Sequence, residues 1–245
     1  MGIVYRDTRV LCCAEVATRT PIEPPPPETE EELRLRARRL AGWTLSDLAG
    51  HLGERAPLDL RRAKGWVGEA LERALGATSG SQPEPDFPHL GIEMKSIPVG
   101  HDGLPRESTY VSTVPLIGHA GLRWEGSLVR RKLCRVLFIP VEGARDIPVP
   151  LRRIGSPLLW SPIPEEEAVL SRDFEELMEM VCLGEVERIS AHYGTYLQIR
   201  PKAANARART ACVGTDGRAI ETLPRGFYLR ATFTAGLLRR HFLLP

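Results

Sequence analysis

Two carboxylates and a lysine stand close together in the stretch PEPDFPHLGIEMKSIPV, residues 83–99. Asp86 follows a proline, and Glu93 and Lys95 stand one residue apart in a run that predicts a β-strand. Side chains two residues apart in a strand share a face, so Glu93 and Lys95 should point the same way, backed by apolar residues on the other face. Two converging carboxylates repel each other unless a cation lies between them, and their oxygens suit a hard divalent cation. Such a site, with the lysine holding or polarising a water, could attack a phosphorus atom.

On its own this pattern is weakly specific. A similar string arises by chance in many sequences, and a salt bridge on a solvated strand face explains the same residues. The cysteines and histidines offer no rival site, because the five cysteines are scattered without a C-x-x-C pair and the six histidines have no H-x-x-x-H spacing. We therefore expect reduced thiols, no zinc, and Mg²⁺ as the bound metal, with Mn²⁺ as a substitute.

The elements that must position this stretch are helices before it and mainly strands after it. Thr29 and Glu32 form a capping box, which predicts the start of a helix that Gly42 ends. The further predicted elements are helices at 45–52 and 65–76; strands at 91–99, 108–115 and 135–141; a helix at 164–183; a hairpin of 186–190 with 195–200; a helix at 202–212; a strand at 226–230; and a helix at 234–243. Helices and strands are intermixed, so the predicted fold class is α/β or α+β, with a mixed β-sheet flanked by helices.

Length and composition bound the class of protein. A chain of 245 residues that is 42% hydrophobic can form one large domain or two small ones. No run approaches the roughly 18 apolar residues of a membrane span, and the N-terminus lacks the apolar core of a signal peptide, so we expect a cytoplasmic protein with no membrane partner. Residues 198–245 hold nine Lys and Arg against two acids, whereas 161–190 hold nine acids against two arginines. The basic C-terminal part could meet phosphate backbones, and a solvated basic face is an equal alternative.

Longer stretches of the chain resemble the MutH family, the strand-nicking endonucleases of bacterial methyl-directed mismatch repair. The resemblance implies a restriction-endonuclease-like fold with two lobes, about 24–130 and 131–245, around a DNA-binding cleft. It covers residues 24–244, and residues 1–23 are expected to be a disordered extension. The stretches that carry it are KGWVGEALERALGATSGSQPEPDFPHLGIEMKSIPV, VRRKLCRVLFIPVEG, RRIGSPLLWSP, YLQIRPKAANA and LPRGFYLRATFT.

The resemblance implies roles for individual residues. Asp86 and Glu93 match the metal-binding carboxylates of the family, and Lys95 matches its catalytic lysine. Glu72 matches a further catalytic acid, although the sequence alone indicates only an exposed acid on a helix. The residues that match DNA contacts are Lys64, Tyr110, Lys132, Arg200, Lys202, Arg225 and Tyr228. For Lys64 and Lys132 the resemblance implies a phosphate contact or a place in the active site.

These DNA contacts divide by chemistry. Arg200 and Lys202 could donate to guanine O6 and N7 in a major groove. Tyr228 matches the residue that senses the adenine N6-methyl group of GATC, since a ring packed against adenine would reject the added bulk. Arg225 is expected at a phosphate rather than a base. An ordinary surface or buried side chain remains the alternative for Lys64, Tyr110 and Lys132.

The implied activity is Mg²⁺-dependent nicking of the unmethylated strand of double-stranded DNA at hemimethylated GATC sites. The implied partners are MutL as an activator and MutS indirectly, and the acidic helix at 164–183 or the closing helix could be the docking surface for MutL. One active site per chain implies a monomer. Two alternatives stay open: a stand-alone restriction endonuclease that cuts both strands at GATC, and a non-catalytic DNA-binding subunit that recruits repair proteins.

Overall fold

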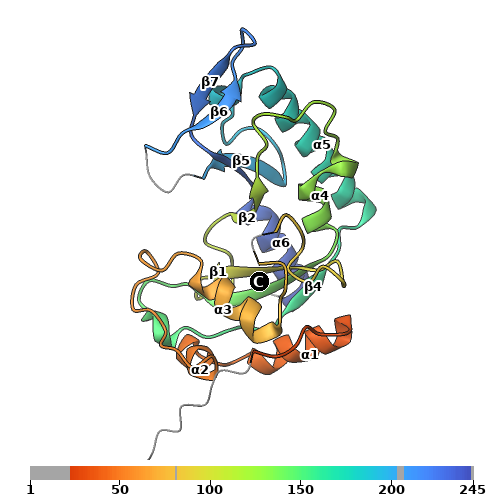
Figure 1. Cartoon of the computed structure of the whole chain (residues 1–245). Coiled ribbons are helices and arrows are strands. Elements are labelled where there is room, and N and C mark those ends of the chain that lie inside the picture. Colours follow the sequence, from red (N-terminus) through yellow and green to blue (C-terminus); the bar gives the residue numbers. More distant parts are fainter. Residues whose placement is uncertain (1–22, 81, 203–206, 244–245) are drawn as a thin grey trace, which may run out of the picture.

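The computed structural model describes residues 23–80, 82–202 and 207–243, with helices and strands intermixed (Figure 1). No helix in these ranges is long and apolar enough to cross a bilayer. The helices are α1 (Glu30–Leu40), α2 (Leu45–His51), α3 (Trp66–Leu75), α4 (Leu128–Leu133), α5 (Pro164–Cys182) and α6 (Ala231–Phe242). The strands are β1 (Glu93–Val99), β2 (Thr109–Thr113), β3 (Val136–Glu142), β4 (Leu158–Trp160), β5 (Leu197–Pro201), β6 (Thr210–Val213), β7 (Ala219–Thr222) and β8 (Arg225–Leu229).

These strands form three sheets within the described residues. β1 and β3 are parallel, with Glu93 opposite Val136, and β4 runs antiparallel to β3. In the second sheet β8 lies between β2 and β5, and all neighbours are antiparallel. β6 and β7 form a separate hairpin. The first sheet is mixed and helices flank it, which confirms the predicted fold class.

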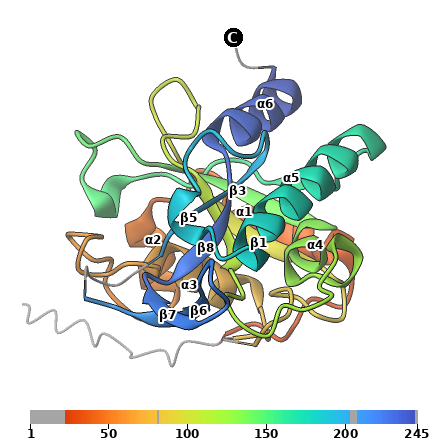
Figure 2. The same ribbon diagram turned by 90° about the horizontal axis from the view of Figure 1, so that it is seen from above.

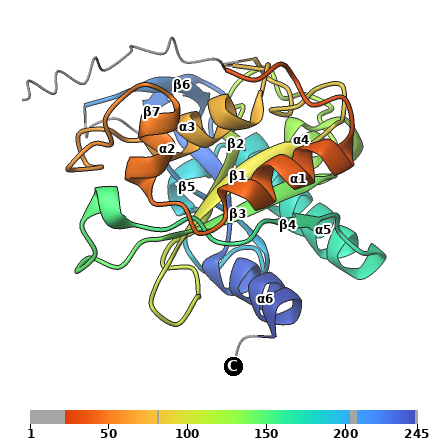
Figure 3. The same cartoon turned by 90° about the horizontal axis from the view of Figure 1, so that it is seen from below.

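The β1–β3–β4 sheet has a hydrophobic core on each face. On one face, Leu33 of α1 and Leu71 of α3 belong to the same buried cluster as Met94. On the other face, Phe138 of β3 lies in a cluster with Phe174 of α5 and with the second sheet. Figure 3 shows the side of α1, α2 and α3, and Figure 2 shows the opposite side with α5, β5 and β8. Because both faces of β3 are covered, its sequence is apolar from Val136 to Val141.

The helices before β1 begin and end at the expected short-range signals. Thr29 accepts a hydrogen bond from the backbone N–H of Glu32 at the start of α1, and a complete capping box begins α2 at Thr44. Gly76 ends α3 with a φ of 82°, and a Cβ atom there would lie 2.6 Å from the carbonyl oxygen of Pro25. Glycine therefore permits both the left-handed backbone and the close approach of the proline segment.

The predicted hairpin of 186–190 with 195–200 is wrong. Val186–Arg188 forms a single turn of 3-10 helix, and β5 pairs with β8 instead. The start of β5 is fixed by Asp173 on α5, whose Oδ2 accepts the three backbone N–H groups of residues 195–197 at 2.6 to 2.9 Å. A tertiary contact with α5 therefore fixes where this strand begins.

The predicted helix at 202–212 is also wrong within the described residues, since Thr210 to Cys212 belong to β6; residues 203–206 lie outside the described part. The turn that follows explains the hairpin. The Gly214 N–H donates to the carbonyl oxygen of Arg218 at 2.8 Å, and Gly217 has a φ of 77°. The Asp-Gly pair in this turn favours a hairpin more strongly than the Ala- and Arg-rich run favours a helix.

The expected boundary between lobes at residue 130 falls between two strands of one sheet. β1 precedes it, β3 follows it, and the two strands pair over their full length. The pairing does not favour a boundary there, and the division stays a prediction. Of the expected extension, residues 1–22 lie outside the described residues, and Glu23 pairs with Arg73 of α3 at 2.6 Å. α4, β4 and β7 were not among the predicted elements.

Candidate active site

A tight loop places Asp86 beside β1. The Phe87 N–H donates to the carbonyl oxygen of Ile92 at 2.9 Å, and the Ile92 N–H donates to that of Phe87 at 3.3 Å. The Oδ2 atom of Asp86 then accepts the backbone N–H of Met94 at 2.8 Å, and its side chain is almost fully buried. The Asp86 carboxylate therefore lies against the strand that carries Glu93.

The Glu93 carboxylate has no exposed surface, and two lysines hold it. Lys95, on the same face of β1, donates to Oε1, and Lys132 donates to both oxygens at 2.9 Å. Lys132 lies in the last turn of α4, which leads directly into β3, and the carbonyl oxygen of Arg135 accepts the Glu93 N–H at 3.0 Å. This connection sets Lys132 against Glu93. Sequence reasoning missed the contact because no local pattern joins residues 39 apart.

Neighbouring charges keep Lys95 protonated. Burial of the ammonium group lowers the pKa of Lys95, but the carboxylates of Glu93 and Asp86 outweigh burial and raise that pKa above its ordinary value. Lys95 is therefore a hydrogen-bond donor at neutral pH and not a base.

Glu72, on α3, completes the acidic group. Burial raises the pKa of its carboxyl group from 4.5 to about 7, and repulsion by Asp86 adds to the rise. The side chain is half-buried, so the sequence-based interpretation of Glu72 as an exposed helix acid is wrong. Glu72 lies one turn before Gly76, at the end of the helix that leads to Asp86. This position is the sequence signal that could have indicated its place in the site. A carboxyl group with such a raised pKa in a hollow is typical of functional sites.

One open cavity joins these residues to the second sheet. It has a volume of about 710 Å³, and its lining includes Glu72 and Lys95 on one side and Tyr110, Lys202 and Tyr228 on the other. Figure 1 shows α3 and β1 below β2 and β5. The fold thus brings Glu72, Lys95 and part of the predicted DNA-reading set to the same hollow, whereas Asp86 and Glu93 are buried and do not line it.

The wall of the cavity opposite the acids is aromatic and basic. Tyr110 of β2 pairs with Tyr228 of β8, and their rings lie 5.4 Å apart in a T-shaped arrangement. The Nζ of Lys202 lies 2.9 Å from the centre of the Tyr110 ring, and the Cζ of Arg200 lies 5.9 Å from that of Tyr228. Gly226 permits this packing, because a Cβ atom there would lie 2.9 Å from the Tyr110 ring. Burial raises the pKa of Tyr228, so its phenol stays protonated.

Four of the predicted DNA contacts do not line this cavity: Lys64, Lys132, Arg200 and Arg225. Lys64 is exposed and lines an adjoining cavity of about 530 Å³. Arg225 is only 6% exposed, and its Nη2 lies 2.9 Å from Oε2 of Glu187, so its guanidinium group is held in an ion pair. A phosphate contact by Arg225 stays a prediction.

Oxygen atoms are the donors that Asp86 and Glu93 offer to a metal ion. Among the residues that the structure describes, no three His, Cys, Asp or Glu side chains are placed to coordinate one ion together. Two carboxylates still fit Mg²⁺, which binds through one or two carboxylates and keeps water or phosphate oxygens in its other positions. The repulsion that raises the pKa of Glu72 would be offset by a cation beside Asp86.

The mixed sheet, with two acids and a lysine beside its first strand, defines a protein of the restriction-endonuclease-like fold. A family model described as DNA mismatch repair enzyme MutH matches residues 75–173, and a DNA mismatch repair protein MutH of Escherichia coli (strain K12) is 58% identical over 219 residues. The chain belongs to the MutH family.

The relatives match this chain over nearly their whole length. The Escherichia coli protein aligns with 89% of this chain and 96% of its own. A DNA mismatch repair protein MutH of Serratia proteamaculans is also 58% identical with the same coverage, and one of Yersinia enterocolitica is 55% identical over 223 residues, 91% of this chain and 98% of its own. The family model spans Asp86, Glu93, Lys95, Tyr110 and Lys132.

Proposed function

We propose that this protein is a DNA mismatch repair endonuclease that nicks the unmethylated strand at hemimethylated GATC sites by metal-dependent hydrolysis of a phosphodiester bond. The observation that carries the proposal is the single cavity of about 710 Å³ whose lining includes Glu72 and Lys95 on one side and Tyr110, Lys202 and Tyr228 on the other. A duplex read by the aromatic and basic wall would present its backbone to the acids and to Lys95.

Asp86 and Glu93 would hold Mg²⁺, or Mn²⁺ in its place. When bound, the ion would supply positive charge that stabilises the phosphate in the transition state and lowers the pKa of a water. The two carboxylates offer only oxygen ligands, which suits this choice. Lys95 and Lys132, which donate to the Glu93 carboxylate, would keep it in position to serve as a ligand.

The protein side chains would divide the remaining work. Lys95, kept protonated by its neighbours, would donate a hydrogen bond that positions the attacking water or stabilises a phosphate oxygen. Lys132 would hold Glu93 in place or contact a phosphate oxygen. Glu72, whose pKa of about 7 lies near the working pH, would help to position that water.

Base recognition would come from the opposite wall. Arg200 and Lys202 would donate to guanine O6 and N7, which are exposed in the major groove. Tyr228 would lie against the adenine, where an N6-methyl group has no room beside the packed ring of Tyr110. Because this wall would distinguish methylated from unmethylated adenine, the cut would fall on one strand. A single active site per chain supports a monomer that makes one nick.

The proposed function also implies protein partners and a cellular location. MutL would activate the nick, and MutS would act through MutL, as in the family that the chain resembles. The substrate is chromosomal double-stranded DNA, so the protein would act in the cytoplasm.

A plasmid nicking assay tests the proposal. The substrate is a supercoiled plasmid with one hemimethylated GATC site, incubated with Mg²⁺ with and without MutL, and the control is the same plasmid without the site. We expect a nick only in the unmethylated strand, enhanced by MutL. A double-strand cut without MutL would instead support a restriction endonuclease, and binding without any cut would support a recruitment subunit.

A further inference from the structure

The active-site cavity does not end at Lys95 but continues along β1 into two further hollows. It shares Ser96, Pro98 and Glu107 with the adjoining cavity of about 530 Å³, and that cavity shares Pro98 and Arg152 with a third of about 920 Å³. We call the second and third hollows together the flanking groove. Neither hollow is lined by Tyr110, Lys202 or Tyr228, so the flanking groove leads away from the wall that would read bases.

The flanking groove is positively charged. Its lining holds five basic residues and three acidic ones, Asp59, Glu107 and Glu142, so the positive charges exceed the negative charges by two. The basic residues come from three separate segments: the loop before α3, the turn after β1 and the loop after β3. They are Arg61, Lys64, Arg106, Arg145 and Arg152.

Two of these arginines are available for a ligand. The Arg61 side chain is 91% exposed, and among the described residues it pairs with Asp59 of the same loop at 3.2 Å. Arg145 is exposed and forms no ion pair within the described part of the chain. Arg152, by contrast, donates to the carbonyl oxygens of Ala144 and Ile147 at 3.2 and 3.1 Å, which fixes the loop that carries Arg145.

We propose that the flanking groove binds the phosphate backbone of the duplex outside the recognised site. The inference rests on the proposed function, because the active-site cavity, with which the groove is continuous, would hold the phosphodiester that is cut. Lys95 lines the active-site cavity, and Pro98 lines both hollows of the flanking groove. The two residues are separated by about 10 Å along β1, at about 3.3 Å per residue, or about three base-pair steps of 3.4 Å. The phosphates that Arg61 and Arg145 contact would therefore lie about three base pairs or more from the cut.

The test is the salt dependence of DNA binding by the Arg61→Ala/Arg145→Ala variant, measured without metal so that no DNA is cut. Each lost phosphate contact lowers the slope of log K against log salt by about 0.9, so the slope should fall by about 1 to 2 on a duplex of about 30 base pairs. On a duplex that ends about two base pairs beyond GATC on each side, the variant should match the wild type.

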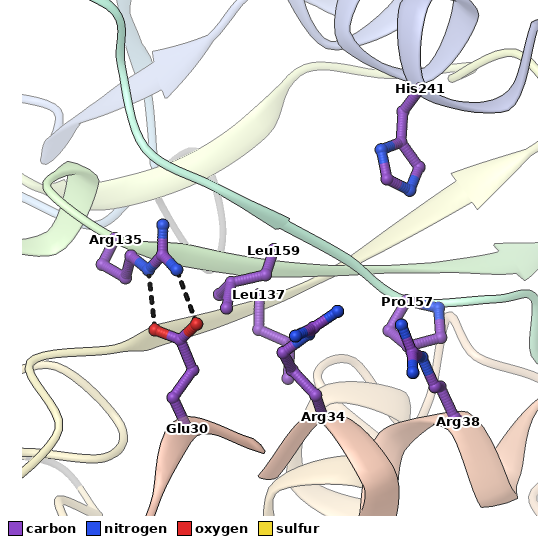
Figure 4. Close-up of a pocket in the computed structure, with 8 residues that line it drawn as sticks. All are labelled: Glu30, Arg34, Arg38, Arg135, Leu137, Pro157, Leu159 and His241. Carbon is purple, nitrogen blue, oxygen red and sulfur yellow. Dashed lines mark hydrogen bonds and ion pairs between the residues drawn. The ribbon is translucent and has the colours of Figure 1, made fainter.

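A matched control lies in a separate basic pocket between α1, β4 and α6 (Figure 4). Its lining includes Arg34, which pairs with Glu31 as Arg61 pairs with Asp59, and the exposed Arg38, and it shares no lining residue with the flanking groove. The Arg34→Ala/Arg38→Ala variant loses the same net charge and should keep the wild-type slope.

Three results would overturn the inference: an unchanged slope for Arg61→Ala/Arg145→Ala on the long duplex, an equal fall in the control variant, or an equal fall on the short duplex. The readout is separate from cleavage. If the wild type fails to nick GATC plasmid but the slope difference holds, the proposed function is wrong and the groove stands. If the wild type nicks GATC plasmid but Arg61→Ala/Arg145→Ala has the wild-type slope, only the inference about the flanking groove is wrong.

Discussion

Lys132 donates to both carboxylate oxygens of Glu93 at 2.9 Å, although 39 residues separate the two in the chain. Glu93 has no exposed surface, so its charge depends on this contact and on Lys95. Lys132 thus joins α4 to the acid that would hold the metal, and the stability of the fold and the chemistry of the site depend on the same ion pair.

Replacing Lys132 by alanine should weaken both the fold and the reaction. The buried Glu93 carboxylate would lose one of its two cations, at a cost of about 1–3 kcal/mol in the free energy of unfolding. Loss of one donor near the reacting phosphate should slow single-turnover nicking by about 100-fold or more. Arg131, the exposed neighbour on α4, is the control, and Arg131→Ala should change neither quantity. Wild-type stability and rate for Lys132→Ala would contradict the assigned contact.

Glu72 should make the metal-free protein less stable as the pH rises. The pKa of its carboxyl group is about 7 in the folded protein against 4.5 for an ordinary glutamate, so between these values the folded state holds a proton that the unfolded chain has released. The free energy of unfolding therefore falls as the pH rises through this window.

Glu72→Gln removes the carboxyl group whose ionisation destabilises the fold at high pH. The Tm of the variant minus that of the wild type should therefore be larger at about pH 8 than at about pH 4.5. Thermal denaturation in a chelator measures it. The exposed acid Glu84, in the loop before Asp86, offers Glu84→Gln as a control with no such pH dependence. A Tm difference for Glu72→Gln that stays constant with pH would argue against a buried carboxyl at this position.

Tyr228 should carry the discrimination against methylated adenine through its ring. Tyr228→Ala opens space beside Tyr110, so the preference for the unmethylated strand should fall by about tenfold or more. This estimate follows from the roughly 1–3 kcal/mol by which a packed pocket distinguishes ligands that differ by one methyl group. Tyr228→Phe keeps the ring and should keep the preference. The measurement is the ratio of nicking rates on hemimethylated and fully methylated duplexes, and a wild-type ratio in Tyr228→Ala would assign discrimination elsewhere.

Local patterns predicted the helix that carries Glu72 and the strand that carries Glu93 and Lys95, and long-range contacts decided the rest. The two-residue period of a strand predicts that Glu93 and Lys95 share a face, and the capping residue Thr29 predicts the start of α1. Neither pattern could find the contact of Lys132 with Glu93, because it depends on how α4 enters β3.

Competing local signals explain the errors. The run at 202–212 is rich in helix-favouring residues, yet part of it is β6, because the Asp216-Gly217 turn returns the chain into β7. Arg225 matches a DNA contact of the family; the fold buries it against Glu187, and its phosphate contact stays a prediction. The candidate residues followed from the resemblance to a family, but their arrangement in space could be seen only in the folded chain.

The most direct test of the account compares binding and cleavage in Asp86→Asn. The asparagine side-chain oxygen can still accept the Met94 N–H, so the loop should keep its shape while the negative charge is lost. Wild type and variant are assayed on the same labelled hemimethylated duplex, for affinity without metal and for strand-resolved nicking with Mg²⁺. The account predicts near wild-type affinity and no nick by Asp86→Asn. Nicking at the wild-type rate would contradict it.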